Sequence, residues 1–386
     1  MSWSTVRADQ FCTLITDGTH DSPKPQQSGW KLITSKHLKG HYIDFDSANW
    51  ISEVDYLKVI SRSAVEQWDI LFSMIGTIGN IYLEKNPHVE YACKNMGIFK
   101  FSGNKENALW MYYYLKSPQA KAYIQTHLRG STQAYVPLGG LREMPVPVPP
   151  QSVRNGIIAV LRPIDEKIEC NNAINDNLQQ QAAALFSSLY DRSNTEVRFT
   201  DLIQILGGGT PKTGENSYWN GNIAFFTPKD VGTPYTLITE KTISKEGLSH
   251  CNSRLYPVNT VFVTARGTVG KVGMSGVPMA MNQSCYALVG KETHQLLVYF
   301  YTLKAVDRLK HKASGAVFDA ITTRDFESEQ IMKLSDDDAT AFLRVAEPMF
   351  QEVLNNNIEN LRLSTLRDSL LPKLMSGEID VSAVLL

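Results

Sequence analysis

Two short segments, GTIG (Gly76–Gly79) and GTVG (Gly267–Gly270), combine glycines with small hydroxyls, as loops that bind phosphate groups do. A nucleotide-binding phosphate loop requires a Gly-Lys pair that is followed by Ser or Thr. In this chain Lys271 follows Gly270, but Val272 comes next. The missing Ser or Thr therefore argues against a nucleotide-binding loop at GTVG, and GTIG has no Gly-Lys pair at all.

Residues that could catalyse a reaction or hold a metal do not form a recognisable motif. The sequence contains neither the HExxH pattern of zinc proteases nor the GxSxG pattern of serine hydrolases. Its five cysteines are scattered without a CxxC pair, and its eight histidines do not cluster. Asp165-Glu166-Lys167 could belong to a nuclease site, but the helical pattern around it predicts a solvated helix face. We therefore predict a chain that is not an enzyme and has no metal or cofactor of its own.

The glycine segments have two other interpretations. Both follow strand-like runs, ILFSMI and VFVTAR, so glycines with positive φ could simply close a hairpin at each. Alternatively, a tight turn at the end of a strand lets backbone amides and small hydroxyls approach a phosphate or a base edge. The candidates for such contacts with DNA are Ser73, Gly76, Thr77, Gly267, Thr268 and Lys271.

Long polar side chains near these segments add further candidates. Arg266 stands where the first segment has Ile75, and arginine can pair with guanine or phosphate through two N–H groups. Two related tripeptides, Thr34-Ser35-Lys36 and Thr227-Pro228-Lys229, and the glycine-rich stretch that begins at Gly207 also carry cations and hydroxyls. From them we select Lys36, Thr210, Lys212 and Lys229; the alternative for the lysines is an ordinary surface position.

The sequence repeats itself once, at a distance of about 190 residues. GTIG aligns with GTVG at an offset of 191 (267 − 76), and in a later block Pro163 aligns with Pro348 at an offset of 185 (348 − 163). The copies share a frame but differ at exposed long side chains. We therefore expect an internal pseudo-two-fold repeat whose halves read two different half-sites.

Each copy ends in a segment whose apolar residues alternate in spacings of three and four, the pattern of a helix that packs against another helix. Ser152 is a plausible cap of the first helix, and Pro163 and Pro348 should kink the helices or mark their starts. Asparagines occupy corresponding seam positions: Asn171, Asn175, Asn356 and Asn360. Since a polar seam residue needs a partner, we predict that these asparagines specify the register of the helices.

The composition is that of an ordinary folded protein, with 386 residues, 43% hydrophobic and 20% charged. A net charge of −1 argues against a simple basic nucleic-acid-binding protein. The chain has no apolar run long enough for a membrane span and no secretory signal, so we expect a cytoplasmic protein without a membrane partner. Short strands, with helices at Ala108–Leu128, broken near Ser117, and at His294–Lys312, predict an α+β fold.

The ordered series of motifs resembles the specificity subunit of type I restriction-modification systems. It runs from GGGTPKTGENSYWNGNIAFFTPKDV through TARGTVGKVG, MNQSCYALVG and the segment Gly315–Phe326 to LRDSLLPKLMSGEIDV. The resemblance implies two globular target-recognition domains, at 1–150 and 194–336. It also implies two long helical spacers, at 151–193 and 337–380, packed as an antiparallel coiled coil.

The same resemblance implies the partners. The chain would read an asymmetric, bipartite site in double-stranded DNA. Its helices would dock two methyltransferase subunits and, through them, restriction/translocase subunits. S-adenosylmethionine, ATP and Mg²⁺ are expected on those partners, which would also supply phosphate contacts and so reconcile DNA binding with a net charge near zero.

Two alternatives from other classes stay open at this point. A duplicated, non-catalytic scaffold that binds protein or carbohydrate partners is favoured by the even charge balance and the lack of basic runs. A self-contained enzyme would require a catalytic constellation that we do not find in the sequence.

Overall fold

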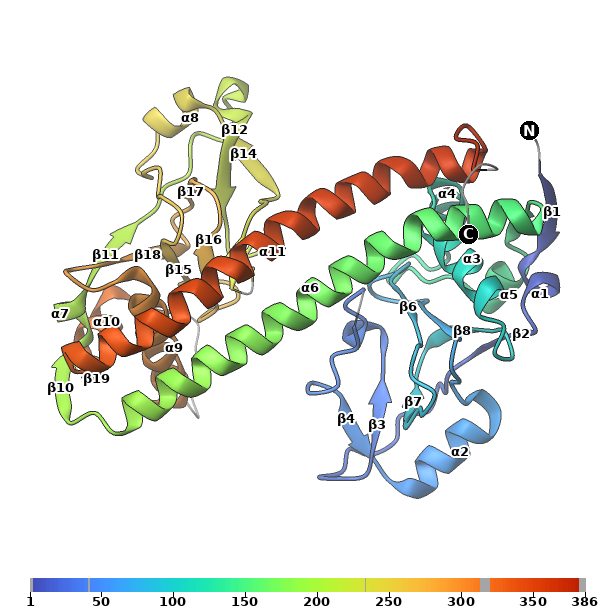
Figure 1. Ribbon diagram of the computed structural model, residues 1–386, viewed down its shortest axis with the longest axis horizontal. Coiled ribbons are helices and arrows are strands. Elements are labelled where there is room, and N and C mark those ends of the chain that lie inside the picture. The colour runs from blue at the N-terminus through green and yellow to red at the C-terminus, as the bar shows by residue number, and fades with distance from the viewer. Residues whose placement is uncertain (1–2, 41, 233, 313–319, 382–386) are drawn as a thin grey trace. The chain divides into compact units, whose positions relative to one another are not determined.

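A computed structural model of the protein describes residues 3–40, 42–232, 234–312 and 320–381. Gly315, at the start of one of the family-like segments, lies outside them. The chain divides into two compact units: unit 1 comprises Met1–Glu169 with Leu363–Leu386, and unit 2 comprises Cys170–Arg362. Figure 1 shows two long helices, α6 (Gln151–Asp191) and α11 (Asp336–Ser376). The boundary between the units falls within both helices.

Unit 1 combines small sheets with short helices. Its strands are β1 (Ser4–Arg7), β2 (Leu14–Asp17), β3 (Trp30–Ile33), β4 (Asn49–Ile51), β5 (Ile70–Ser73), β6 (Ile81–Leu83), β7 (Tyr91–Cys93), β8 (Met96–Lys100) and β9 (Pro145–Val148). Its shorter helices are α1 (Ala8–Phe11), η1 (Ser35–His37), α2 (Glu53–Ser63), α3 (Lys105–Lys116), α4 (Pro118–Thr126) and α5 (Leu138–Arg142). The sheets have the orders β2-β8-β5-β6 and β4-β3-β7, and β1 pairs with β9.

Unit 2 is built in the same way. Its strands are β10 (Thr195–Arg198), β11 (Ile203–Gly207), β12 (Trp219–Phe226), β13 (Tyr235–Thr236), β14 (Lys241–Ile243), β15 (Val261–Thr264), β16 (Val272–Ser275), β17 (Met279–Met281), β18 (Cys285–Gly290) and β19 (Gln330–Lys333). Its shorter helices are α7 (Phe199–Leu202), η2 (Asn216–Tyr218), α8 (Lys245–Ser249), α9 (Gln295–Lys312) and α10 (Thr323–Ser328). The sheets have the orders β11-β18-β15-β16-β13 and β14-β12-β17, and β10 pairs with β19.

The strand orders confirm the predicted α+β fold and its internal repeat. β11-β18-β15-β16 repeats β2-β8-β5-β6, and unit 2 adds β13 at the edge. β12 runs parallel to β17 and antiparallel to β14, as β3 does to β7 and β4. The predicted break at Ser117 is also confirmed, because its hydroxyl accepts a hydrogen bond from Ala120 N (3.3 Å) and caps α4.

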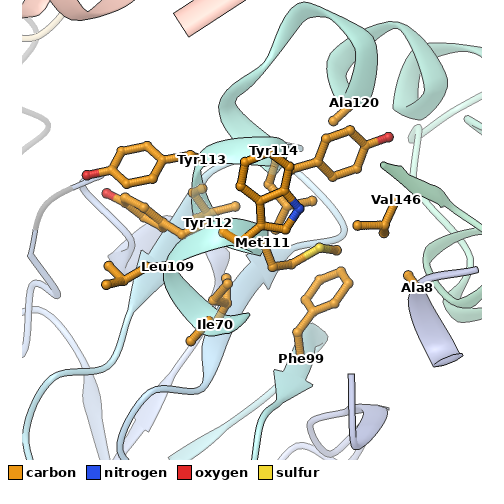
Figure 2. Packing of buried hydrophobic residues seen from close by; sticks show 14 of the residues in the cluster. Ala8, Ile70, Phe99, Leu109, Met111, Tyr112, Tyr113, Tyr114, Ala120 and Val146 are labelled. Atoms are coloured by element: carbon orange, nitrogen blue, oxygen red, sulfur yellow. The ribbon is translucent and has the colours of Figure 1, made fainter. Parts of the chain in front are cut away.

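The core of unit 1 forms around α3, which is buried on nearly all sides. Figure 2 shows Tyr112 and Tyr113 pointing to one side of this helix and Tyr114 to the other, with Ile70 and Phe99 of the sheet nearby. A helix that is apolar all round must be covered on all faces. Strands cover one part of α3, and buried residues of α6 and α11 belong to the same core.

The two long helices pack antiparallel within each unit, as predicted. In unit 1 Asp165 of α6 contacts Arg367 of α11, and in unit 2 Phe186 of α6 packs against Phe342 of α11. Helix α6 begins at Gln151, so Ser152 is not its cap; the carbonyl of Pro150 accepts a hydrogen bond from Arg154 N (3.1 Å).

Neither seam proline marks the start of a helix. Pro163 lies inside α6, and Pro348 lies inside α11. Buried residues on both sides of each proline, such as Leu161 before Pro163 and Phe350 after Pro348, keep the same helix face packed. This packing outweighs the lost backbone hydrogen bond.

The prediction that Asp165 lies on a solvated face is wrong. Its carboxylate is buried and pairs with Arg367 Nη1 (2.7 Å) and with Lys116 Nζ of α3 (3.2 Å). Burial by itself would raise the pKa of Asp165, but Lys116 and Arg367 outweigh it and lower this pKa. Arg367, which interrupts the apolar seam of α11, therefore has its partner in α6.

Candidate nucleic-acid interface

The two glycine segments form equivalent hairpin turns. GTIG joins β5 to β6, and GTVG joins β15 to β16. Gly76, Gly79, Gly267 and Gly270 have φ angles of +77°, +89°, +82° and +73°. Residues other than glycine rarely adopt this region of φ, so the backbone explains the repeated Gly-x-x-Gly spacing. The structural interpretation of the glycines is confirmed.

A buried hydroxyl supports each turn from inside. Ser73 is fully buried, and its Oγ donates to the Ile75 carbonyl (3.3 Å). Its counterpart Thr264 is also fully buried; its hydroxyl donates to the Thr268 carbonyl and accepts from Lys271 N (2.9 Å). The selection of Ser73 as a contact residue is therefore corrected, because its side chain holds the turn and does not reach the surface.

The exposed threonine of each turn connects it to the lysine-bearing tripeptide. Thr77 Oγ1 donates to the Ser35 carbonyl (3.4 Å), and Thr268 Oγ1 donates to the Pro228 carbonyl (3.2 Å). The next residues, Lys36 and Lys229, are both exposed. Thus the same juxtaposition of a glycine turn with a lysine occurs twice, from segments that are about 40 residues apart in the chain.

In unit 2 these elements surround a concavity of about 450 Å³. Its lining includes the predicted residues Lys229, Arg266, Gly267 and Thr268. Lys229 is 80% exposed and lies 3.6 Å from Glu240, an ion pair that is too exposed to hold the lysine firmly. The ion pairs among the described residues include none with Arg266, so its guanidinium is available to a ligand.

Sequence reasoning missed Asn282 and Ser284, which line the same concavity. The Ser284 carbonyl accepts hydrogen bonds from Ala265 N (2.8 Å) and Arg266 N (3.2 Å), so the segment before β18 is fastened to the turn. Both residues belong to the MNQS segment, one of the ordered motifs that carry the family resemblance. Their amide and hydroxyl groups are of the kind that reads base edges.

The remaining candidates of unit 2 are Thr210, Lys271 and Lys212, and none of them lines the concavity. Thr210 donates to Gln283, next to the residues that line the concavity. Lys271 is exposed within the turn segment. Lys212 is exposed as well, but its carbonyl accepts from Trp219 Nε1 (3.3 Å), and it is not among the residues lining the concavity.

Helix α9 brings another cation to the turn, which the sequence does not indicate. A Cβ on Gly270 would lie 2.6 Å from Lys310 Cε and 3.4 Å from its Nζ. The positive φ of Gly270 favours glycine, and the end of the Lys310 side chain lies next to the turn. Since 40 residues separate the two positions, no local spacing could reveal the contact.

The four seam asparagines meet one another within unit 2. Asn171 Nδ2 donates to Asn360 Oδ1 (2.9 Å) and to Glu359 Oε2 (2.7 Å). Asn356 Nδ2 donates to Asn175 Oδ1 (2.9 Å), and Asn175 Nδ2 donates to Asn357 Oδ1 (2.9 Å). The predicted partners are thus present, while the role of the asparagines in specifying register stays a prediction.

The described residues include no cluster of three His, Cys, Asp or Glu side chains that could hold a metal ion. None of the described helices has both the length and the hydropathy that crossing a membrane requires. What the two turns offer is a set of exposed cations, hydroxyls and amides on a backbone held by glycines. Such a surface can bind phosphates and base edges.

Comparison with known proteins shows which family and which fold this chain resembles. A family model described as "Type I restriction modification DNA specificity domain" matches residues 2–180 and 192–333. The type I restriction enzyme HindI specificity subunit of Haemophilus influenzae is 22% identical over 415 aligned residues, covering 85% of this chain and 90% of that one. The MjaIX specificity subunit of Methanocaldococcus jannaschii is 29% identical over 127 residues, covering 31% of this chain and 29% of its own. The crystal structure of a type I restriction-modification S subunit from M. genitalium has the same fold, with a TM-score of 0.57 and 14% identity over 97% of this chain and 96% of that one.

Proposed function

This chain belongs to the family of type I restriction-modification DNA specificity subunits, and from this premise we propose that its two units read the two blocks of a bipartite DNA site. The site is asymmetric because the units carry different side chains on the same frame. In unit 2 Arg266, Lys229, Thr268 and Thr210 contact one block, and in unit 1 Thr77, Lys36 and the backbone at Gly76 contact the other.

The observation that carries this proposal is the repeated turn. In each unit a glycine hairpin and a lysine-bearing segment are joined by one threonine hydrogen bond. Conserving the frame while exchanging Ile75 for Arg266 is what two readers of different sequences require. Arginine in the major groove discriminates guanine from other bases by about 1–3 kcal/mol.

The chemistry then belongs to other subunits of the complex. We propose that the paired long helices dock two methyltransferase subunits and, through them, restriction/translocase subunits. S-adenosylmethionine, ATP and Mg²⁺ would bind to those partners, and this chain would hold no cofactor. The complex would work in the cytoplasm. With a net charge of −1, the chain alone should bind DNA weakly.

The test is to map methylated sites in DNA treated with the reconstituted complex, with wild-type chain and with Arg266→Ala. We expect a bipartite site for the wild type and relaxed selectivity in one block for the variant. Arg266→Lys should behave like Arg266→Ala at a guanine, because lysine lacks the planar pair of donors. Lys245→Ala, which removes an exposed cation of α8, is the control and should change neither block.

Two results would contradict the proposal. Equal loss of selectivity in both blocks for Arg266→Ala would refute the assignment of one unit to each block. A wild-type complex that methylates no bipartite site would instead favour a scaffold that binds other partners.

A further inference from the structure

Each unit places the residue just before its glycine turn directly opposite one residue of a later segment. In unit 1 Ile75 forms an antiparallel bridge with Tyr135, and in unit 2 Arg266 forms one with Ala320. The neighbouring hydrogen bonds are also equivalent: Val136 N donates to the Met74 carbonyl (2.9 Å) and Ile321 N to the Ala265 carbonyl (2.9 Å). The two positions in each unit thus form a structurally repeated pair.

Burial shows which way these pairs face. Met74 and Val136 are buried in the core of unit 1, 9% and 0% exposed. Successive side chains of an extended segment point to opposite sides, so Ile75 and Tyr135 point away from that core. Tyr135 is 42% exposed. Residues opposite each other in an antiparallel pair have Cβ atoms about 5 Å apart on the same face.

Unit 2 follows the same alternation. Ala265 and Ile321 are buried, 3% and 2% exposed. Arg266, which follows Ala265 and precedes the turn, is exposed. Its opposite residue, Ala320, is small. In unit 2 the longer side chain of the pair, Arg266, therefore comes from the position before the turn, whereas in unit 1 the longer side chain, Tyr135, comes from the later segment.

The backbone holds Tyr135 in place. Arg129 N donates to the Tyr135 carbonyl and Tyr135 N donates to the Arg129 carbonyl, both at 2.9 Å, which closes the loop between them. Gly130 has a φ of +89°, and a Cβ there would lie 2.3 Å from the Gln133 carbonyl oxygen. This tight loop fixes the base of an exposed aromatic side chain next to Gly76 and Thr77.

We propose that Tyr135 is the side chain of unit 1 that determines its base preference, in the position that Arg266 occupies in unit 2. The inference rests on the proposed function of both units as DNA readers. A phenol ring offers an apolar surface and carries no charge, so its target differs from that of arginine. Apolar side chains in the major groove recognise the 5-methyl group of thymine. The block read by unit 1 therefore contains a thymine contacted by Tyr135.

The test uses the complete complex reconstituted with its methyltransferase subunits and a library of randomised DNA sites, read by sequencing of methylated products. For Tyr135→Ala we expect selectivity at one base pair of the unit 1 block to fall about tenfold, with the other block and the spacer unchanged. Tyr135→Phe keeps the ring and should stay within about twofold of wild type. Leu57→Ala, another exposed apolar residue of unit 1, is the control and should have no effect.

A second measurement separates contact from mere support of the fold. Replacing thymine by uracil in the unit 1 block removes the methyl group from the DNA and leaves the protein unchanged. Binding by the wild-type complex should weaken at one thymine, and binding by Tyr135→Ala should not respond at that position. The double variant Ile75→Arg/Tyr135→Ala, which transfers the unit 2 pair to unit 1, should move the preference from thymine towards guanine.

Unchanged selectivity in Tyr135→Ala, or a wild-type complex that is indifferent to uracil throughout the unit 1 block, would overturn this inference. Both outcomes leave a bipartite site intact, so they spare the proposed function. Absence of any bipartite site with the wild-type complex would instead remove the proposed function itself.

Discussion

Units 1 and 2 share one frame but hold the long helices by different means. In unit 1 a charged group does so: Asp165 of α6 pairs with Lys116 of α3 and with Arg367 of α11. A second ion pair, Lys85 to Glu169 (2.5 Å), adds to it near the surface. Here the globular part and both long helices meet around one buried carboxylate.

In unit 2 aromatic rings attach the globular part to the two long helices. Phe186 of α6 stacks on Phe300 of α9 with ring centroids 5.0 Å apart and meets Phe342 of α11 edge-on at 5.5 Å. Phe300 also contacts Phe350 of α11 at 5.5 Å. Position 350 is the repeat counterpart of Asp165 (350 − 165 = 185), so a carboxylate in one copy corresponds to a phenyl ring in the other.

The comparison shows that the two copies keep the same arrangement of a core helix against α6 and α11, while the side-chain interactions that hold this arrangement differ between them. Both solutions fill the space between a core helix and the helix pair. A buried ion pair must offset the cost of desolvating its charges, whereas aromatic packing has no such cost. The units should therefore respond differently to mutation, to salt and to pH.

The largest effect is expected from Phe186→Ala, which removes the ring shared by α6, α9 and α11 in unit 2. Phe186 is 1% exposed, and truncating such a residue costs about 3–5 kcal/mol. Hydrogen–deuterium exchange should accelerate in α9 much more than in α3. The loss should be the same at low and high salt, and a strong salt dependence would contradict the aromatic character of this attachment.

Asp165→Ala is the matching change in unit 1 and should cost about 3 kcal/mol, because it leaves Lys116 and Arg367 without their shared partner. Its neighbour Glu166, which forms an exposed pair with Arg162, provides the control; Glu166→Ala should stay within about 0.5 kcal/mol. Five of the six tryptophans, at positions 3, 30, 50, 68 and 110, lie in unit 1 and report its unfolding by fluorescence.

If Asp165→Ala and the control Glu166→Ala destabilised unit 1 equally, Asp165 would contribute no more than a surface charge does. If Asp165→Ala accelerated exchange in α9 as much as in α3, the two attachments would not be separate. Either outcome would remove the contrast between the units.

Asp165 also shows where prediction from sequence stops. The repeat, the turns at Gly76 and Gly267 and the long helices follow from periodicity and from the φ angles that glycine permits, which are local properties. The burial of Asp165 depends on Arg367, 202 residues away, and on Lys116 of another helix. A helical pattern shows which face is apolar, but it does not show which single charge on that face will meet a partner.

The residues of the candidate site also fall into two groups, those that a local motif indicates and those that depend on contacts between distant segments. Thr77, Thr268, Arg266 and Lys229 could be selected from motif and residue type, and the structure brings the unit 2 members of this group together. Ser73 has the right chemistry and the right motif, yet it is buried. Lys310 and Tyr135 reach the turns through contacts between distant segments, for which neither composition nor spacing carries a signal.

A smaller effect is expected at the asparagine pairs, which lie in unit 2. Asn356→Ala leaves the buried Asn175 Oδ1 without its donor and should cost about 1–2 kcal/mol. The double variant Asn175→Leu/Asn356→Leu should recover this stability but lose the preference for one register. Distances between spin labels on α6 and α11 should be narrowly distributed in the wild type and broad in the double variant. A narrow distribution in both would show that the asparagines do not specify register.

The smallest effect is that of acid on unit 1, since a protonated Asp165 can still form hydrogen bonds. Burial would raise the pKa of Asp165, but Lys116 and Arg367 outweigh it and lower this pKa in the folded chain. The ionised form therefore stabilises the fold at pH values above the pKa of the unfolded chain, about 4, and the contribution is lost as the pH falls through the lower folded value. Asp69 has the opposite sign, because burial raises its pKa more than Lys100 lowers it.

Comparison with Asp165→Asn isolates the contribution of Asp165 from that of Asp69, which both proteins share. The difference in unfolding free energy between wild type and this variant should be constant from about pH 7 to pH 5 and should shrink below about pH 4. The corresponding difference between wild type and Phe186→Ala, followed in α9 of unit 2, should not change over this range, because no ionisable group is removed there. A wild-type advantage over Asp165→Asn that persists unchanged into strong acid would show that the carboxylate holds α3, α6 and α11 together without its charge.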